Sequence, residues 1–377
     1  MRKTRTAALA VAAMLAAGCQ TPGEEAPALD EEEAARVHTM LDENHELIAE
    51  VLDVQYRIVT DCMEAAGFTV HDQYQEVMWN YQQQSLPRRE DRFTPWLIDR
   101  DIAAEWGFGS WTSTLEMYGS EESVEFETLM DEGFDSFADV DNTAFMGLPN
   151  EEKFDWYVAH YGEERALAEQ GWLIGETGPE GASDGVLVVT TEPGGCVGEM
   201  IEALGLTAEF VPQPDFGEDA GSWATFPPAP GTELLATGEL GAELREARER
   251  DEAFLDCLEE TGWGEWDFND RGDLNIWYFL DRAYSDMPSN PAAFMTDGAP
   301  EPPSDVPVDA EARRAWEVGF ALDVHDCVDE TDFDEDAERA WNRVYGTRFL
   351  ELETDAHAWQ EEIRALIARA QELLAGE

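Results

Sequence analysis

The sequence is poor in basic residues, and above all in lysine. Its 377 residues include 84 Asp and Glu against 23 Lys and Arg, a formal net charge of −61. Lys3 and Lys153 are the only lysines. Nucleic-acid binding depends on basic side chains that neutralise phosphates, and docking on anionic lipid headgroups depends on the same side chains. The composition therefore argues against both.

The acidity itself has two interpretations. A solvated surface adapted to high salt is the first, because salt screens the self-repulsion of the carboxylates. Capture of cations or of a cationic partner is the second. The composition favours the first interpretation and leaves the second open.

The sequence also lacks a long hydrophobic run at its start. Ala7–Ala17 is an apolar run of 11 residues, whereas a helix that spans a bilayer needs about 20. Arg2, Lys3 and Arg5 precede it. A short apolar run behind a positive segment is typical of a secretory signal peptide.

Residues Leu15 to Cys19, LAAGC, resemble the lipobox of bacterial lipoproteins. The resemblance implies that the chain is cleaved before Cys19 and that the Cys19 thiol carries a diacylglyceryl group. Two acyl chains, palmitate for example, suffice for stable anchoring. The membrane would then be a partner through the anchor, and the domain would lie on the extracytoplasmic face of the cell membrane. The alternative is an ordinary secretory signal with an incidental cysteine.

Four cysteines remain, and an even number outside the cytoplasm suggests two disulfides with three possible connectivities. DCMEAAGF (Asp61–Phe68) and DCLEETGW (Asp256–Trp263) share one pattern, in which an amphipathic helix ends at a glycine five residues after its cysteine. The simplest pairing is sequential, with one bridge in each half of a duplicated layout: Cys62 with Cys196, and Cys257 with Cys327.

We therefore predict a mainly α fold: an irregular, disulfide-stapled helical domain with two similar halves and at most a small β-hairpin. Helices are expected at 29–66, 97–106, 121–131, 151–170, 239–262, 309–329 and 335–375, with the first and last long helices side by side. GVLVVTTE (Gly185–Glu192) is expected to be a strand. The predicted organisation is a signal peptide at 1–18, an acidic tether at 19–35, a first Cys-paired half at 36–213, a Pro-rich connection at 214–238 and a second Cys-paired half at 239–377.

The cysteine-bearing helices, with AAEWGFGSW (Ala103–Trp111) and EEKFDWYVAHYG (Glu151–Gly162), resemble uncharacterised secreted proteins and lipoproteins of actinobacteria. The resemblance covers most of residues 36–375 at the level of pattern. It implies no activity.

Motifs that carry chemistry are weak. DFNDRGDLNIWY (Asp267–Tyr278) superficially matches a calcium loop, but Arg271 and Tyr278 occupy ligand positions. TDFDEDAE suits the acidic first turn of a helix better than a metal site. The six histidines show no ligand spacing, and no nucleophile elbow, P-loop or dinucleotide motif occurs. We expect no catalytic residue, no metal and no cofactor.

The leading hypothesis is a non-catalytic envelope protein that engages another protein or a cell-wall polymer. The first alternative is a saccharide- or cation-binding module that uses the tryptophans of the segment Trp79–Trp111. The second is a wall hydrolase with a pair of carboxylates. With 84 acidic residues, close carboxylate pairs arise by chance and carry little weight.

Overall fold

A computed structural model describes residues 29–81, 93–117, 119–130, 140–175, 191–212, 221–235, 238–284 and 297–376. The fold is mainly helical, as expected from the sequence, with one two-stranded antiparallel sheet among the described residues. No helix in these ranges is long and apolar enough to cross a membrane. Cys19 and most of the predicted strand at 185–192 lie outside the described residues.

Helix α1 (Glu31–Ala65) is the long first helix that the periodicity predicts. It begins inside the range assigned to the tether, at a capping box in which Asp30 accepts from the Glu33 backbone and Glu33 accepts from that of Asp30. Gly67 follows its end with a φ of +98°, and Gly262 follows helix α11 (Asp251–Thr261) with a φ of +93°. Both predicted helix-ending glycines are therefore confirmed.

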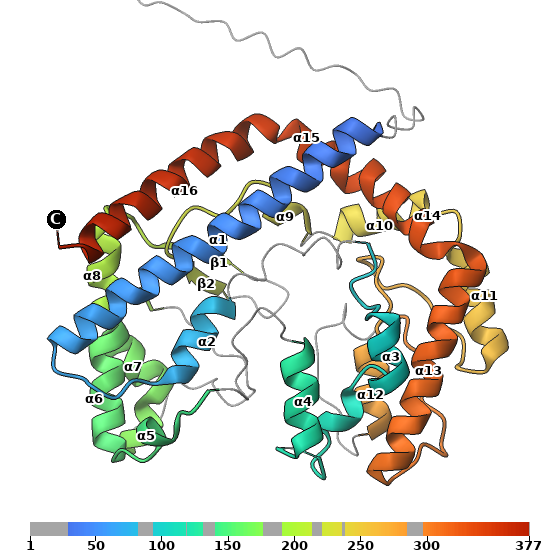
Figure 1. The fold of residues 1–377 in the computed structure, drawn as a ribbon, viewed down its shortest axis with the longest axis horizontal. Helices are drawn as coiled ribbons and strands as arrows, with labels where there is room; N and C mark the ends of the chain where they lie inside the picture. Colours follow the sequence, from blue (N-terminus) through green and yellow to red (C-terminus); the bar gives the residue numbers. More distant parts are fainter. Residues whose placement is uncertain are drawn as a thin grey trace, which may run out of the picture.

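Helix α16 (Glu353–Leu374) lies along α1 across the top of the molecule (Figure 1). The Gln360 amide donates to Asn44 Oδ1 at 2.8 Å, and both side chains are buried between the two helices. Trp359, Ile363, Leu366, Ile367 and Ala370 face the same core as Leu47–Met63 of α1. The predicted pairing of the two terminal helices is confirmed.

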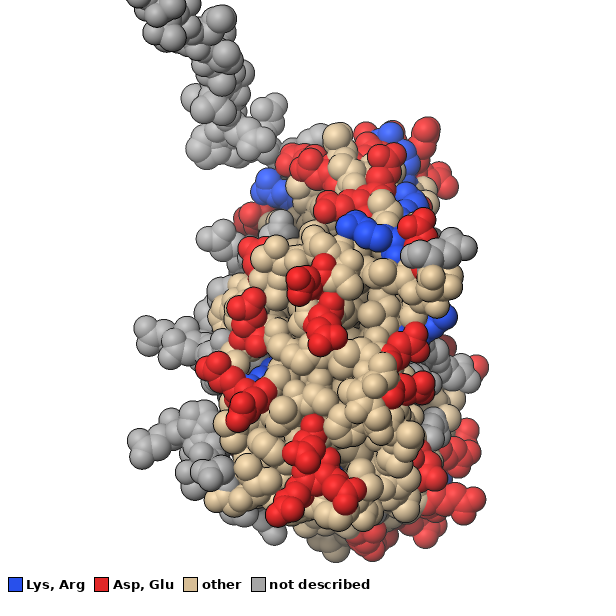
Figure 2. All heavy atoms as spheres, turned by 90° about the vertical axis from the view of Figure 1, so that its left-hand side faces the viewer, with Lys and Arg blue, Asp and Glu red and all other residues tan. Residues whose placement is uncertain are grey.

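One lobe lies on the left of Figure 1, where the C-terminal ends of α1 and α16 are found. Its core contains α1, α16 and the following elements: α2 (Gln73–Tyr81), α5 (Thr143–Met146), α6 (Asn150–Tyr161), α7 (Glu163–Gln170), η3 (Gly171–Ile174) and α8 (Gly195–Ala203). We call this the first lobe. Asp and Glu are spread over its outer face, and Lys and Arg are few there (Figure 2).

A second lobe lies on the right of Figure 1. Its core draws on α3 (Arg100–Trp106), η2 (Ser110–Ser113), α4 (Glu121–Met130), α11 (Asp251–Thr261), α12 (Ile276–Tyr284) and α13 (Ala310–Thr331). A smaller core under the first turns of α1 joins the lobes. It includes α10 (Gly238–Ala247), α14 (Phe333–Trp341), the π-helical η7 (Asn342–Gly346) and α15 (Thr347–Glu351), near the short α9 (Thr232–Leu235).

The two lobes do not coincide with the predicted halves at 36–213 and 239–377. Each lobe contains residues from both ranges. Residues 93–130 pack in the second lobe with α12 and α13. Helix α16, at the end of the chain, packs in the first lobe.

Three of the predicted helices are interrupted in the structure. The 151–170 helix is divided at Gly162, which has a φ of +93° between α6 and α7. The 335–375 helix is divided by η7 and again at Leu352. The 239–262 helix is divided into α10 and α11, and the backbone N–H groups of Glu249 and Arg250 at this break donate to Asp336 of α14 at 2.7 and 2.9 Å.

The small sheet pairs β1 (Glu209–Pro212) with β2 (Gly221–Ala224). In its register Phe210 faces Trp223, and their rings meet edge to face at 5.5 Å. The hairpin thus lies partly in the stretch that the sequence assigns to a Pro-rich connection. Cross-strand aromatic pairs of this kind stabilise a sheet. The prolines of the segment led instead to the prediction of an irregular connection.

Candidate functional site

An open pocket of about 790 Å³ in the second lobe is lined in part by residues of α4 and α12. These two helices are near the bottom of Figure 1, to the right of the first lobe. Residues of η2 and the turn after it form one side, and α12 with the start of α13 forms the other. Its lining is mainly apolar, with a few polar groups, as is usual for binding pockets. Its lining residues are Gly109, Ser110, Ser113, Thr114, Leu115, Glu116, Phe126, Trp277, Asp281, Tyr284, Val308 and Arg313.

The inner wall of the pocket is held by the buried carboxylate of Glu317. The N–H of Ser110 donates to Glu317 Oε1 at 2.8 Å, and the N–H of Trp111 donates to Oε2 at 3.0 Å. The Tyr284 hydroxyl donates to Oε2 at 2.7 Å. These N–H groups begin the 3₁₀ helix η2 and have no partner within it, so the carboxylate of α13 caps it from outside. Burial raises the pKa of Glu317 to about 7, against the opposing effect of these donors.

Gly109 allows the wall to close on the ring of Phe126. Its φ is +77°, and a Cβ there would lie 1.9 Å from the Phe126 ring. Only glycine fits both the left-handed backbone and this contact. The turn from α3 into η2 therefore places Ser110 and Ser113 on the pocket side.

The rim of the pocket carries apolar side chains that the fold itself does not bury. Leu115 is 99% exposed, Val308 79% and Trp277 44%. One part of the Trp277 ring meets Phe108 edge to face at 6.0 Å, so the indole is held in place while much of it stays in contact with solvent. All three side chains line the same pocket, and exposed apolar side chains gathered in one place often mark an interaction site.

Charged groups at the pocket are mainly acidic. Glu116 and Asp281 bring carboxylates, and Arg313 brings one guanidinium. Arg313 already donates from Nε to the Pro307 carbonyl at 3.0 Å and lies over the Tyr284 ring at 5.2 Å. The lining also carries the hydroxyl groups of Ser110, Ser113, Thr114 and Tyr284.

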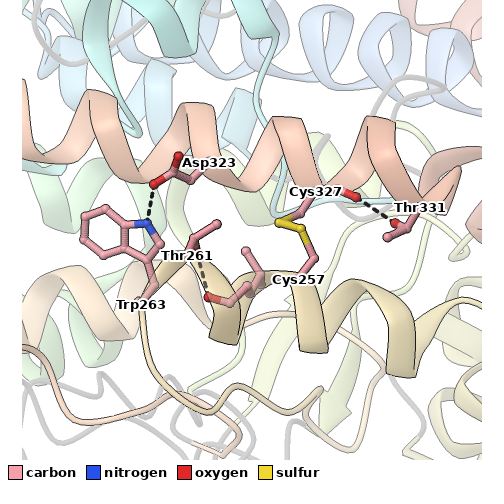
Figure 3. The surroundings of a disulfide bond; sticks show 7 residues. Cys257, Thr261, Trp263, Asp323, Cys327 and Thr331 are labelled. Carbon is pink, nitrogen blue, oxygen red and sulfur yellow. Dashed lines mark hydrogen bonds between the residues drawn. A yellow bond between two sulfur atoms is a disulfide. The ribbon is translucent and has the colours of Figure 1, made fainter.

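The four predicted disulfide cysteines lie away from this pocket and form the sequential pairs. Cys62 bonds to Cys196 and Cys257 to Cys327, each with a Cα–Cα distance of 5.7 Å. The second bond joins α11 to α13, beside the Trp263 indole, which donates to Asp323 at 2.7 Å (Figure 3). These cysteines hold helices together and are not among the lining residues of the second-lobe pocket.

The tryptophans of the segment Trp79–Trp111 are core residues. Trp79, Trp96, Trp106 and Trp111 are all at most 8% exposed. Trp79 donates to the Leu52 carbonyl and Trp111 to the Trp106 carbonyl. Their rings are therefore closed to a stacking sugar, and in the described residues a half-exposed indole in a pocket is found at Trp277 instead.

The loop that resembles a calcium site uses its oxygens internally. Asn269 Oδ1 accepts from the backbone of Arg271 and Asp273 at 2.8 and 2.9 Å. Asp267 accepts from Arg245 at 2.7 Å. The Arg248 guanidinium donates to the Gly272 carbonyl at 2.8 Å, so a cationic side chain lies against the loop.

The acidic run after α13 is the start of α14, as the sequence suggests. Asp336 accepts a hydrogen bond from the Glu249 N–H at the break between α10 and α11, and Asp334 accepts one from the Thr94 hydroxyl at 3.4 Å. Within the described residues no group of three or more His, Cys, Asp or Glu side chains is placed to hold a metal. His38 is buried and stacks on Trp341 at 5.5 Å.

The pocket residues were missed in the sequence because they come from three distant segments. The available signals were small: Leu115 follows the polar run TST, and Val308 stands at the end of a Pro-rich segment. Neither has a periodic partner, so periodicity does not detect them.

Comparison with known proteins gives no further guide. No protein-family model, no curated protein and no solved structure matches the chain. The resemblance to actinobacterial lipoproteins thus stays a prediction from the sequence, and function is argued below from the pocket.

Proposed function

We propose that the protein is a lipid-anchored, extracytoplasmic envelope protein without catalytic activity, and that its second-lobe pocket docks a segment of another protein. The observation that carries the proposal is the apolar rim. Leu115 is fully exposed and Val308 largely so, so they contribute little to folding, whereas a partner that covers them would gain about 25 cal/mol for each Å² removed from water.

A saccharide is the second candidate ligand. Trp277 supports it, because its indole is half-exposed and lies in one pocket with Ser110, Ser113, Asp281 and Arg313. Aromatic faces with nearby polar groups suit sugars. Leu115 and Val308 at the rim would contribute less to such a ligand than to an apolar peptide side chain.

The docking proposal is tested by photo-crosslinking on cells. A photoreactive phenylalanine analogue at position 115 or 308 should trap one defined partner. The same analogue at position 146 is the control, because Met146 is 57% exposed in the first lobe. A saccharide is favoured by two results together. The tryptophan fluorescence of wild type, but not of Trp277→Phe, would change saturably with one saccharide, and no crosslink would form at position 115. Equal crosslinking at 115 and 146 would contradict docking at the pocket.

The anchor is tested separately. Cys19→Ser protein should leave the membrane fraction, and mass spectrometry of the wild-type N-terminal peptide should show the added diacylglyceryl mass. Membrane partitioning of Cys19→Ser equal to that of wild type would contradict the anchor without touching the pocket.

A further inference from the structure

We propose that the segment bound by the pocket is positively charged: a basic peptide stretch of the partner that carries at least one large apolar side chain. This inference rests on the proposed function and adds the chemistry of the partner. The pocket combines apolar surface with carboxylates, and its single cationic group is already engaged by the protein.

The apolar part of the match comes from the rim and the volume. Leu115 and Val308 are exposed and line a space of about 790 Å³, which is of the size usual for ligand sites. Trp277 and Phe126 add aromatic surface to the lining. Val308 directly precedes the N-cap Asp309 of α13, and with 79% exposure most of its side chain is in contact with solvent.

The charged part of the match comes from Glu116 and Asp281. Both line the pocket, and carboxylates beside an accessible indole suit an ammonium or guanidinium group, which is attracted by both. Arg313 does not cancel this preference, because its guanidinium lies over the Tyr284 ring and donates to the Pro307 carbonyl.

The net charge of the chain also favours a basic partner. A chain of −61 repels acidic partners and attracts basic ones, which raises the rate of encounter and suppresses wrong partners. The same repulsion disfavours a second copy of this chain as the occupant, since each copy would bring its own −61. A basic segment of a different protein meets both requirements of the pocket.

The experiment is calorimetric titration of the oxidised protein, residues 20–377, with capped hexapeptides. Three of the peptides have a central Leu-Phe pair, flanked on both sides by two Lys, two Gln or two Glu. The fourth has Ser-Gly in the centre, flanked on both sides by two Lys. We expect the Lys peptide with Leu-Phe to bind tightest. It should weaken about tenfold or more in Leu115→Ser/Val308→Ser, which removes apolar contact.

The charge contribution is isolated by Glu116→Gln/Asp281→Asn. This variant should weaken the Lys peptide by about five- to tenfold and leave the Gln peptide unchanged. The matched control is Glu361→Gln/Glu362→Gln, which removes the same number of carboxylates from the exposed face of α16 in the first lobe. It should leave both peptides unchanged. Thermal melts of all variants check that each remains folded.

The outcomes separate this inference from the proposed function. Equal affinity for Lys and Gln peptides, lost in Leu115→Ser/Val308→Ser, would overturn the basic partner and keep the docking site. Equal affinity for the two Lys peptides, with or without Leu-Phe, would show general electrostatic attraction and overturn the inference. A dimer by sedimentation equilibrium that Leu115→Ser/Val308→Ser dissociates would make a second copy the occupant and overturn it as well. If Leu115→Ser/Val308→Ser bound every peptide with the affinity of wild type, the docking site itself would be contradicted.

Discussion

The Arg248 guanidinium lies 2.7 Å, Nε to Oδ1, from the carboxylate of Asp251, at the break between α10 and α11. The Arg248 side chain is 1% exposed and also lies 4.0 Å above the ring of Phe268. It donates to the Gly272 carbonyl. This ion pair joins the end of one helix, the start of the next and the 267–273 loop at a single buried point.

We predict that Arg248→Met lowers the free energy of unfolding by about 3–5 kcal/mol at pH 7, because it leaves the Asp251 carboxylate without its partner in a partly buried place. Burial already raises the pKa of Asp251 to about 6, and Arg248 opposes that rise. Denaturant titration measures the loss. Adding Asp251→Asn should recover part of it, since the stranded charge is then removed.

The control is Arg364→Met. Arg364 pairs with Glu43 across α16 and α1, but its side chain is 47% exposed, and exposed pairs contribute about 0–1 kcal/mol. Equal losses in Arg248→Met and Arg364→Met would contradict the special role of the buried pair.

A second prediction concerns the pH dependence of stability. The pKa of Glu317 rises from 4.5 to about 7 on folding because the carboxyl group is buried. A carboxyl whose pKa is raised in the folded state stabilises that state while protonated. Its contribution is therefore complete below about pH 4.5 and is lost as the pH rises through about 7, by up to about 3 kcal/mol.

Urea unfolding at pH 5 and pH 7.5 in 1 M NaCl tests this, since the salt screens the general repulsion. Wild type should be more stable at pH 5, and Glu317→Gln should show a smaller difference between the two pH values. Glu116→Gln, which changes an exposed carboxylate of the same pocket, should retain the wild-type difference. An unchanged difference in Glu317→Gln would assign the effect to other groups.

The disulfides allow a third prediction. Their loops span 134 and 70 residues, so on the chain-entropy model each bond contributes roughly 4–5 kcal/mol, slightly more for Cys62–Cys196. Each paired Cys→Ala variant should melt well below wild type. A non-reducing peptide map of wild type should recover the two sequential pairs, and a Cys62–Cys257 peptide would contradict them.

The fourth prediction compares two glycines with left-handed backbones. Gly109→Ala should destabilise the chain strongly, since the new Cβ would lie 1.9 Å from the Phe126 ring. Gly67→Ala has a φ of +98° but no atom within 4 Å of the new Cβ, so it should lose only about 1–2 kcal/mol from the backbone. Melting temperatures of the two variants give the comparison. Equal losses would mean that the Phe126 ring moves aside at little cost and would contradict the prediction.

The sequence by itself determined the local features of this protein. The apolar period of α1, its capping box and the glycines after Cys62 and Cys257 act within a few residues, so they can be recognised without a fold. The sequential disulfide pairing also followed, because the repeated motif placed one cysteine pair in each half of the chain.

The tertiary structure alone decided where helices break and where the pocket lies. The 239–262 run has helical character throughout, but Asp336, from another helix, satisfies the N–H groups of Glu249 and Arg250 at the break. Glu317 caps η2 from about 200 residues away in the same manner. Burial and hydrogen bonding between distant segments set these features, and no local period records which distant carboxylate will reach an unpaired N–H group.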